Sequence, residues 1–277
     1  MATFLQVVWA LLGILSCAGA ALADTHSTPA DTGAYTVVAR QPHKSLSFTQ
    51  GLIFEDGALV ETSGQYGRSF IFRYDADSSK ELAAEPLPKQ IFAEGLTRWG
   101  DEYIVLSWQS GRALRLAASN FEVVGEFRYP GQGWGLTHDG AELIMSDGSH
   151  VLSFRDPKNF ALTRRIEVRD ERRAWGQLNE LEYARGLIWA NVWQPPYVLA
   201  IPPADGRVLA KYDLSVLVEQ SGRRRGEAVL NGIAFDAERD TFWVTGKYWP
   251  DRYEIKLAQP LVNPLPKAPV VIAPAPP

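Results

Sequence analysis

The chain has 277 residues, of which 46% are hydrophobic and 22% are charged, so it is long and apolar enough to bury a large core. Its net charge of −4 gives no reason to expect binding to nucleic acid. Cys17 is the only cysteine, and removal of residues 1–23 leaves none. The remaining chain could then have no disulfide, cysteine nucleophile or thiolate metal site.

Residues 1–23 carry no charged side chain and predict a signal peptide. Their apolar stretch has the length of a secretory hydrophobic region, and Ala21-Leu22-Ala23 has the small-x-small form of a cleavage site. We therefore expect cleavage after Ala23, no membrane association afterwards, and a periplasmic or secreted protein. Two alternatives stay open, namely retention of the segment as a membrane anchor and lipoprotein processing at Cys17.

A short motif recurs five times and predicts the fold. Each copy places a polar or aromatic residue before Gly-Leu or a close equivalent, and the copies start 44, 40, 45 and 52 residues apart. Their first residues are Gln50, Glu94, Trp134, Asn179 and Asn231. Repeats of about 40–50 residues made of short strands are typical of β-propellers. We therefore predict an all-β fold, a five-bladed β-propeller of four-stranded antiparallel blades, over residues 34–257.

Each copy of the motif is followed by a turn signal and a second short strand. These second strands are expected at 58–62, 103–106, 142–145, 187–190 and 241–244. Segment 35–39 reads as a strand without a repeat of its own. We expect it to complete the last blade by pairing near 253–257, which removes an exposed edge. One short helix is expected around 214–220.

The segments that flank the repeats have a different composition. Residues 24–33 are small and polar, which indicates a flexible lead-in. Residues 258–277 are rich in proline, which donates no backbone hydrogen bond and favours polyproline II. We expect this tail to be disordered.

Equivalent positions of all blades converge on the axis of a propeller, so the first residues of the motif should form a ring. The second strands end near Trp108, Asp147, Trp193 and Lys247. Together these residues predict a pocket with flat indole walls and a few convergent polar groups, as small-molecule sites have.

Glu94 is the only carboxylate among the first residues of the motif. Burial among indoles raises the pKa of a carboxyl and suits it to proton transfer, whereas a nearby Lys247 lowers that pKa, and the sequence does not decide between them. Glu94 could instead only accept backbone N–H bonds, and the tryptophans could be core residues. The four histidines show no ligand spacing, which argues against a zinc site.

Six segments carry a resemblance to a known family: FTQGL (48–52), GQYGRS (64–69), GWGLT (133–137), SDGS (146–149), LNELE (178–182) and TGKYWP (245–250). Jointly they resemble the plant-type glutaminyl-peptide cyclotransferases, which also occur in bacteria. The resemblance implies a five-bladed propeller that converts the N-terminal glutamine of peptides or proteins to pyroglutamate and releases ammonia. It implies no required cofactor and no catalytic metal, whereas a structural calcium ion stays open. We expect a monomer.

The resemblance also implies roles for individual residues. Glu94 corresponds to the general acid/base, and Gln50, Asn179 and Lys247 correspond to catalytic residues that orient the substrate and polarise its amide. The expected substrate-binding residues are Phe48, Trp108, Trp134 and Trp193, to which the ring position adds Asn231. Gln132 departs from the family, where an acidic residue is frequent, and the run 194–197 is less polar than usual.

Two other functions fit the same residues. In a calcium-dependent propeller hydrolase or lactonase, Glu94, Asn179 and Asn231 would be metal ligands, because hard cations favour such oxygens. In a non-catalytic propeller, the indoles would bind a peptide or a sugar.

Overall fold

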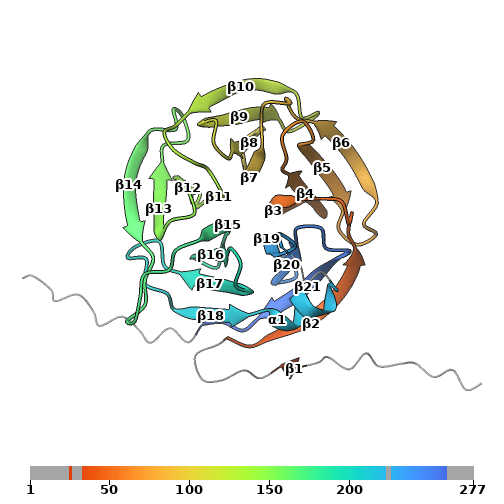
Figure 1. Ribbon diagram of the computed structural model, residues 1–277, viewed down its shortest axis with the longest axis vertical. Helices are drawn as coiled ribbons and strands as arrows, with labels where there is room; N and C mark the ends of the chain where they lie inside the picture. The colour runs from red at the N-terminus through yellow and green to blue at the C-terminus, as the bar shows by residue number, and fades with distance from the viewer. Residues whose placement is uncertain (1–24, 27–32, 223–225, 261–277) are drawn as a thin grey trace, which may run out of the picture.

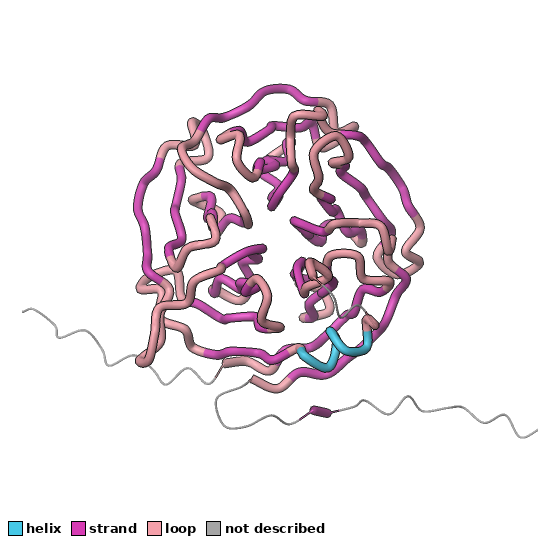
Figure 2. The backbone as a smooth tube through the Cα atoms, viewed as in Figure 1, coloured by secondary structure: helices cyan, strands magenta, loops and turns pink. Residues whose placement is uncertain are grey.

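The computed structural model describes residues 25–26, 33–222 and 226–260, so the predicted signal peptide and most of the predicted tail lie outside the described residues. The described residues form five antiparallel sheets around a central axis (Figures 1 and 2). This arrangement confirms the predicted five-bladed β-propeller. Within the described ranges, no helix has the length and hydropathy needed to span a membrane.

Each blade starts with the strand nearest the axis and proceeds outward (Figure 1). The first blade contains β3 (Thr49–Glu55), β4 (Ala58–Ser63), β5 (Phe70–Asp75) and β6 (Glu81–Pro86). The second contains β7 (Ala93–Trp99), β8 (Glu102–Ser107), β9 (Arg112–Ala117) and β10 (Val123–Arg128). The third contains β11 (Leu136–His138), β12 (Leu143–Met145), β13 (Val151–Arg155) and β14 (Leu162–Glu167). The fourth contains β15 (Leu178–Ala184), β16 (Leu187–Val192), β17 (Tyr197–Ile201) and β18 (Ala210–Asp213).

The fifth blade joins the two ends of the propeller. It contains β19 (Leu230–Asp236), β20 (Thr241–Gly246), β21 (Asp251–Leu257) and β2 (Tyr35–Pro42), with β1 (Thr25–His26) added at the outer edge. β2 pairs with β21 so that Tyr35 faces Leu257, which confirms the predicted closing strand. The predicted short helix is α1 (Ser215–Gln220), between β18 and β19.

The hydrophobic core lies between neighbouring blades. The side chains of Trp189 on β16 and Phe242 on β20 are fully buried, and their rings lie 4.7 Å apart. Val60 on β4 and Val105 on β8 are likewise fully buried in one cluster that joins the first two blades. Because every blade packs on two neighbours, the inner strands are held in fixed positions around the axis.

The recurring glycine of the motif is explained by the close approach of the inner strands. A Cβ atom on Gly135 would lie 2.0 Å from the backbone oxygen of Asn179, so no side chain fits there. The fourth copy has Glu180 at this position, and its fully buried carboxylate accepts the backbone N–H groups of Leu52 at 3.2 Å and Ile233 at 2.7 Å. Burial, reinforced by Glu182, raises the pKa of Glu180 well above its usual range. Glu180 therefore connects the inner strand of the fourth blade to the inner strands of the first and fifth blades.

Candidate active site

A pocket of about 320 Å³ lies at the mouth formed by the first residues of the motif. All the predicted catalytic and substrate-binding residues except Asn231 line it. Its lining comprises Phe48, Gln50, Gln65, Phe92, Glu94, Trp108, Trp134, Asn179, Trp193, Glu227 and Lys247. Gln50, Glu94 and Asn179 come from inner strands, Phe48, Phe92 and Trp134 from the segments just before inner strands, and Trp108, Trp193 and Lys247 from the segments just after second strands.

Glu94 is the second residue of β7, the inner strand of the second blade, and it is only 4% exposed. Its Oε1 accepts a hydrogen bond of 2.9 Å from Nε2 of Gln50. Burial raises the pKa of Glu94 well above its usual range, and the charge of Lys247 opposes this rise without cancelling it. Burial therefore outweighs the charge of Lys247 in setting the direction of the pKa shift of Glu94.

Asn231 lies behind Gln50, outside the residues that line the pocket. Its Nδ2 donates to the backbone oxygen of Thr49 at 2.9 Å and to Oε1 of Gln50 at 3.3 Å. Gln50 in turn donates from Nε2 to Glu94. The assignment of Asn231 to the substrate-binding wall is therefore corrected, because this amide fixes the orientation of the Gln50 amide instead.

Lys247 follows β20 and is 5% exposed. Its Nζ lies 4.5 Å from the centre of the Phe48 ring, and it has no hydrogen-bond or ion-pair partner among the described residues. Burial lowers the pKa of Lys247, while Glu94 and Glu227 act to raise it. A cation held in this way against an aromatic face keeps its three N–H donors for a ligand.

A buried polar cluster holds the loop that carries Lys247. Nδ1 of His43 lies 2.9 Å from the backbone oxygen of Trp249, and Nε2 of His43 lies 3.0 Å from Oε2 of Glu61. Ser47 and Thr49 donate their hydroxyl groups to the same carboxylate. Although burial raises the pKa of Glu61, the charge and hydrogen bond of His43 and the charge of Arg252 hold it down at about 2.

The aromatic walls are connected by ring contacts. The ring centres of Phe92 and Trp108 lie 5.5 Å apart, and those of Trp134 and Trp193 lie 5.8 Å apart with nearly perpendicular planes. Oε1 of Gln132 accepts the indole N–H of Trp108 at 2.9 Å and that of Trp134 at 3.0 Å. One exposed amide thus fixes two of the indoles.

Asn179 supplies an unused acceptor. The residue is 2% exposed, and its Oδ1 is buried without a hydrogen-bond partner among the described residues. Its backbone oxygen is occupied by the hydroxyl of Ser146 at 2.6 Å. A buried acceptor without a partner costs free energy unless a ligand satisfies it, so Oδ1 marks a point where a substrate N–H can bind.

One further expectation about the ring is corrected, and one acidic residue joins the pocket. Asp147 is exposed and does not line the pocket, because its Oδ1 turns back to accept the backbone N–H of Ser149 at 3.0 Å. Glu227 does line it, so Glu94 is not the sole acidic residue there. Glu227 is exposed, whereas Glu94 is buried, and only the buried carboxyl is desolvated.

The sequence analysis did not predict Phe92 and Gln65 at the site, and it named Gln132 only as a departure from the family. Phe92 and Gln132 occupy the position two residues before Glu94 and Trp134, as Phe48 does before Gln50, so the repeat register was a usable signal. Gln65 lies outside this register, and its Nε2 donates to the hydroxyl of Tyr248 at 2.7 Å. Its place depends on the packing of two loops that are distant in the sequence.

The arrangement bears on the calcium hypothesis. Glu94 and Asn179 line the pocket, but Asn231 does not, so the three proposed ligands do not converge there. In the part of the chain that the structure describes, no group of three His, Cys, Asp or Glu side chains is placed to hold a metal ion.

Comparison with known proteins relates this geometry to a family. Residues 8–257 match the family model described as glutamine cyclotransferase. The chain is 39% identical over 228 residues to the glutaminyl-peptide cyclotransferase of Arabidopsis thaliana, a match that covers 80% of this chain and 71% of the relative. The crystal structure of Myxococcus xanthus glutaminyl cyclase superimposes with a TM-score of 0.76 at 34% identity, over 80% of this chain and 96% of that one.

Proposed function

The chain belongs to the glutamine cyclotransferase family, and we propose that it converts the N-terminal glutamine of peptides to pyroglutamate with Glu94 as the proton carrier. The enzyme class, glutaminyl-peptide cyclotransferase, follows from the family. The single observation that carries the assignment of Glu94 is its place as a buried carboxyl in a pocket with aromatic walls, hydrogen-bonded to an amide.

In the proposed reaction, the α-amine nitrogen attacks the side-chain amide carbon of the same residue and forms the ring C–N bond. The resulting tetrahedral intermediate carries a surplus proton on the attacking nitrogen and a negative charge on oxygen. Glu94 takes this proton and delivers it to the side-chain nitrogen. The intermediate then collapses, the C=O bond re-forms, and the side-chain nitrogen leaves as ammonia. A carboxyl whose pKa is raised by burial is a stronger base than an exposed glutamate, which helps it to take the proton from the attacking nitrogen before it passes the proton on.

The surrounding residues have separate tasks in this proposal. Lys247 directs its ammonium toward the developing oxyanion, which it stabilises electrostatically in a pocket that excludes most water. Oδ1 of Asn179 accepts an N–H of the substrate. Gln50 orients Glu94, and Asn231 orients Gln50.

The indole walls favour the folded substrate. Glutamine must bend its side chain back onto its own amine before the ring can close, and a rigid pocket that accepts only the bent form reduces the entropy cost of the reaction. The volume of about 320 Å³ is at the lower end for small-molecule sites, which suits the end of a peptide rather than an internal segment. Peptides and proteins with N-terminal glutamine are therefore the proposed substrates.

The test is ammonia release from a glutamine-initiated dipeptide by the purified protein. Glu94→Gln should lower kcat by about 10²- to 10⁴-fold, because the amide cannot carry the proton. Asp147→Asn is the matched control, since this carboxylate is exposed outside the pocket, and it should retain the wild-type rate. No ammonia from the wild type, or an equal rate in Glu94→Gln, would contradict the proposal. Tryptophan fluorescence that responds to the dipeptide without turnover would indicate a non-catalytic binding protein.

A further inference from the structure

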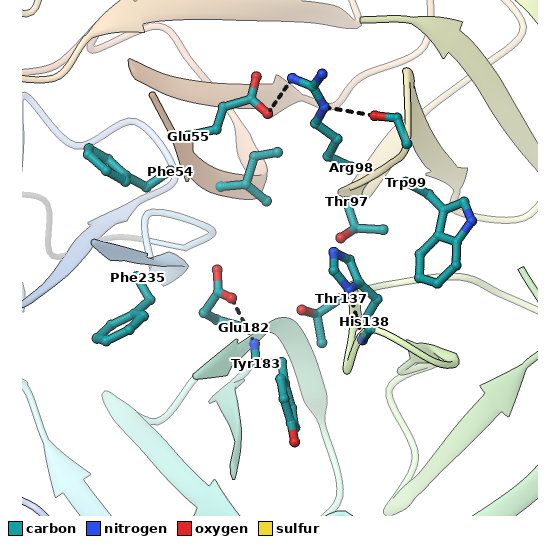
Figure 3. A pocket seen from close by; sticks show the side chains of 13 residues that line it. Phe54, Glu55, Thr97, Arg98, Trp99, Thr137, His138, Glu182, Tyr183 and Phe235 are labelled. Atoms are coloured by element: carbon teal, nitrogen blue, oxygen red, sulfur yellow. Dashed lines mark hydrogen bonds and ion pairs between the residues drawn. The ribbon is translucent and has the colours of Figure 1, made fainter. Parts of the chain in front are cut away.

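A second cavity, of about 550 Å³, lies at the opposite mouth of the propeller axis (Figure 3). Most of its lining comes from the two residues that follow the Gly-Leu motif in each inner strand. If the first residue of the motif is position one, these are the fourth and fifth positions. The fourth positions contribute Ile53, Thr97, Thr137 and Glu182, and the fifth contribute Phe54, Arg98, His138, Tyr183 and Phe235. This cavity and the candidate active site have no lining residue in common.

Three polar side chains point into the cavity. The hydroxyl groups of Thr97 and Thr137 and the carboxyl group of Glu182 converge on its centre (Figure 3). Thr97 is 3% exposed and Thr137 is 5% exposed, and neither hydroxyl has a hydrogen-bond partner among the described residues. Both hydroxyl groups are therefore free to hydrogen-bond a ligand in the cavity.

Glu182 is held in place from behind. Its carboxylate accepts the backbone N–H of Tyr183 at 2.8 Å and is also hydrogen-bonded by the backbone of Phe235. A carboxylate has about four lone-pair sites, so these two bonds leave acceptor capacity toward the cavity.

The positively charged groups near the cavity are already paired, so they do not favour the binding of an anion. Arg98 donates to Glu55 at 3.0 Å, and Arg73 lies 3.1 Å from the same carboxylate. Burial lowers the pKa of His138, which favours its neutral form. The free polar groups at the centre are therefore two hydroxyl oxygens and one carboxyl, all able to accept hydrogen bonds.

We propose that this cavity binds a small ligand through a primary ammonium group, whose three N–H donors meet Glu182, Thr97 and Thr137. The three acceptors match the three donors of an ammonium in number. The cavity is much larger than an ammonium ion, so it has room for the organic part of an amine. Half-buried aromatic side chains lie at its edge, where they pack against the hydrophobic cores of the blades, namely Phe54, Trp99, Tyr183 and Phe235.

The ionisation of Glu182 gives the proposal an independent signature. Burial raises the pKa of this carboxyl to about 8, so at pH 7 it is mostly protonated in the empty cavity. A bound ammonium favours the ionised form, so binding at pH 7 should release a proton. The other ionisable groups near the carboxyl are Glu180 behind it, and Glu55, Arg98 and His138 around the cavity.

Isothermal titration calorimetry at pH 7 tests the proposal with two probes, N-acetyl-lysine amide and ammonium chloride. The first carries a side-chain ammonium but no free α-amine, so it is not a substrate for cyclisation. Binding should be accompanied by release of about one proton per ligand, measured by comparing buffers of different ionisation enthalpy. Tighter binding of N-acetyl-lysine amide would identify an organic amine as the ligand, and equal binding would identify free ammonium.

Variants assign the binding to this cavity. Glu182→Gln should weaken binding by about tenfold or more and abolish proton release, and Thr97→Val and Thr137→Val should each weaken it severalfold. Glu94→Gln alters the other mouth and should bind the probe as the wild type does. Thermal melts check that the variants are folded. If Glu182→Gln does not fold, the two threonine variants test the proposal in its place. Binding of neither probe, or equal affinity in the wild type and the folded cavity variants, would overturn the proposal. Calcium binding in place of both amines, or loss of binding in Glu94→Gln, would also overturn it.

Discussion

Glu61 offers a direct test of how the loop that carries Lys247 is held. Its carboxylate is fully buried 3.0 Å from His43 Nε2, with Arg252 as a further positive charge. Burial raises the pKa of Glu61, but the interaction with His43, the charge of Arg252 and the hydrogen bond from Ser47 outweigh it and lower the pKa from 4.5 to about 2. The difference between the two values corresponds to about 3 kcal/mol of folding free energy.

The sign of the pH dependence follows from the lowered pKa. Because the folded protein binds the proton of Glu61 less readily than the unfolded chain does, the contribution is fully present above about pH 4.5 and is lost as the pH falls toward 2. Glu61→Gln keeps the shape of the side chain and removes its charge, which leaves Arg252 without this counter-charge. We expect the free energy of unfolding of the variant to be about 3 kcal/mol lower than that of the wild type at pH 7. This gap between the two proteins should narrow as the pH falls.

Equilibrium urea unfolding of both proteins between pH 7 and pH 3 measures this gap. Other carboxyls titrate equally in the two proteins and cancel from the difference. Glu81→Gln is the matched control, because Glu81 pairs with Lys44 at 3.2 Å on the surface, and its loss should change stability by less than about 1 kcal/mol. A gap that does not vary with pH, or one no larger than that of the control, would refute the reasoning.

The other predictions concern the candidate active site. Gln132→Leu removes the acceptor shared by two indole N–H groups and should raise KM for a glutamine dipeptide about three- to tenfold, while Gln132→Glu, which keeps an acceptor, should restore it. Asn231→Ala should lower kcat about tenfold with less effect on KM, because the residue acts through Gln50 and does not line the pocket. Lys247→Met removes the charge that lowers the pKa of Glu94, so the limb of the pH–rate profile that reports this carboxyl should move to higher pH.

The blade plan was predictable because it is encoded in a repeat. One register of the motif placed the five inner strands, and the unpaired segment at 35–39 predicted the closing strand β2, which the pairing of Tyr35 with Leu257 confirms. The same register brings Gln50, Glu94, Trp134 and Asn179 to one mouth of the axis, because equivalent residues of each blade face the same way.

Contacts between side chains were less predictable. Asn231 follows the register but is turned behind Gln50, and no periodicity specifies that hydrogen bond. His43 and Glu61 are 18 residues apart and Trp249 is 206 residues from His43, so the cluster that they form exists only once the propeller closes. The sequence thus predicted where the site lies better than it predicted what holds the site in place.

Two buried carboxyls of the first two blades show why partners, rather than burial, decide which one can carry a proton. Glu61 has no exposed surface, but His43 and Arg252 supply positive charge and hold it ionised. Glu94 is almost as deeply buried, but its hydrogen-bond partner is the neutral amide of Gln50, so desolvation dominates and raises its pKa. An acid that is always ionised can anchor a loop but cannot deliver a proton at neutral pH. The neutral partner of Glu94 is therefore the feature that leaves its pKa raised, and it is the reason why we propose Glu94, and not Glu61, as the proton carrier.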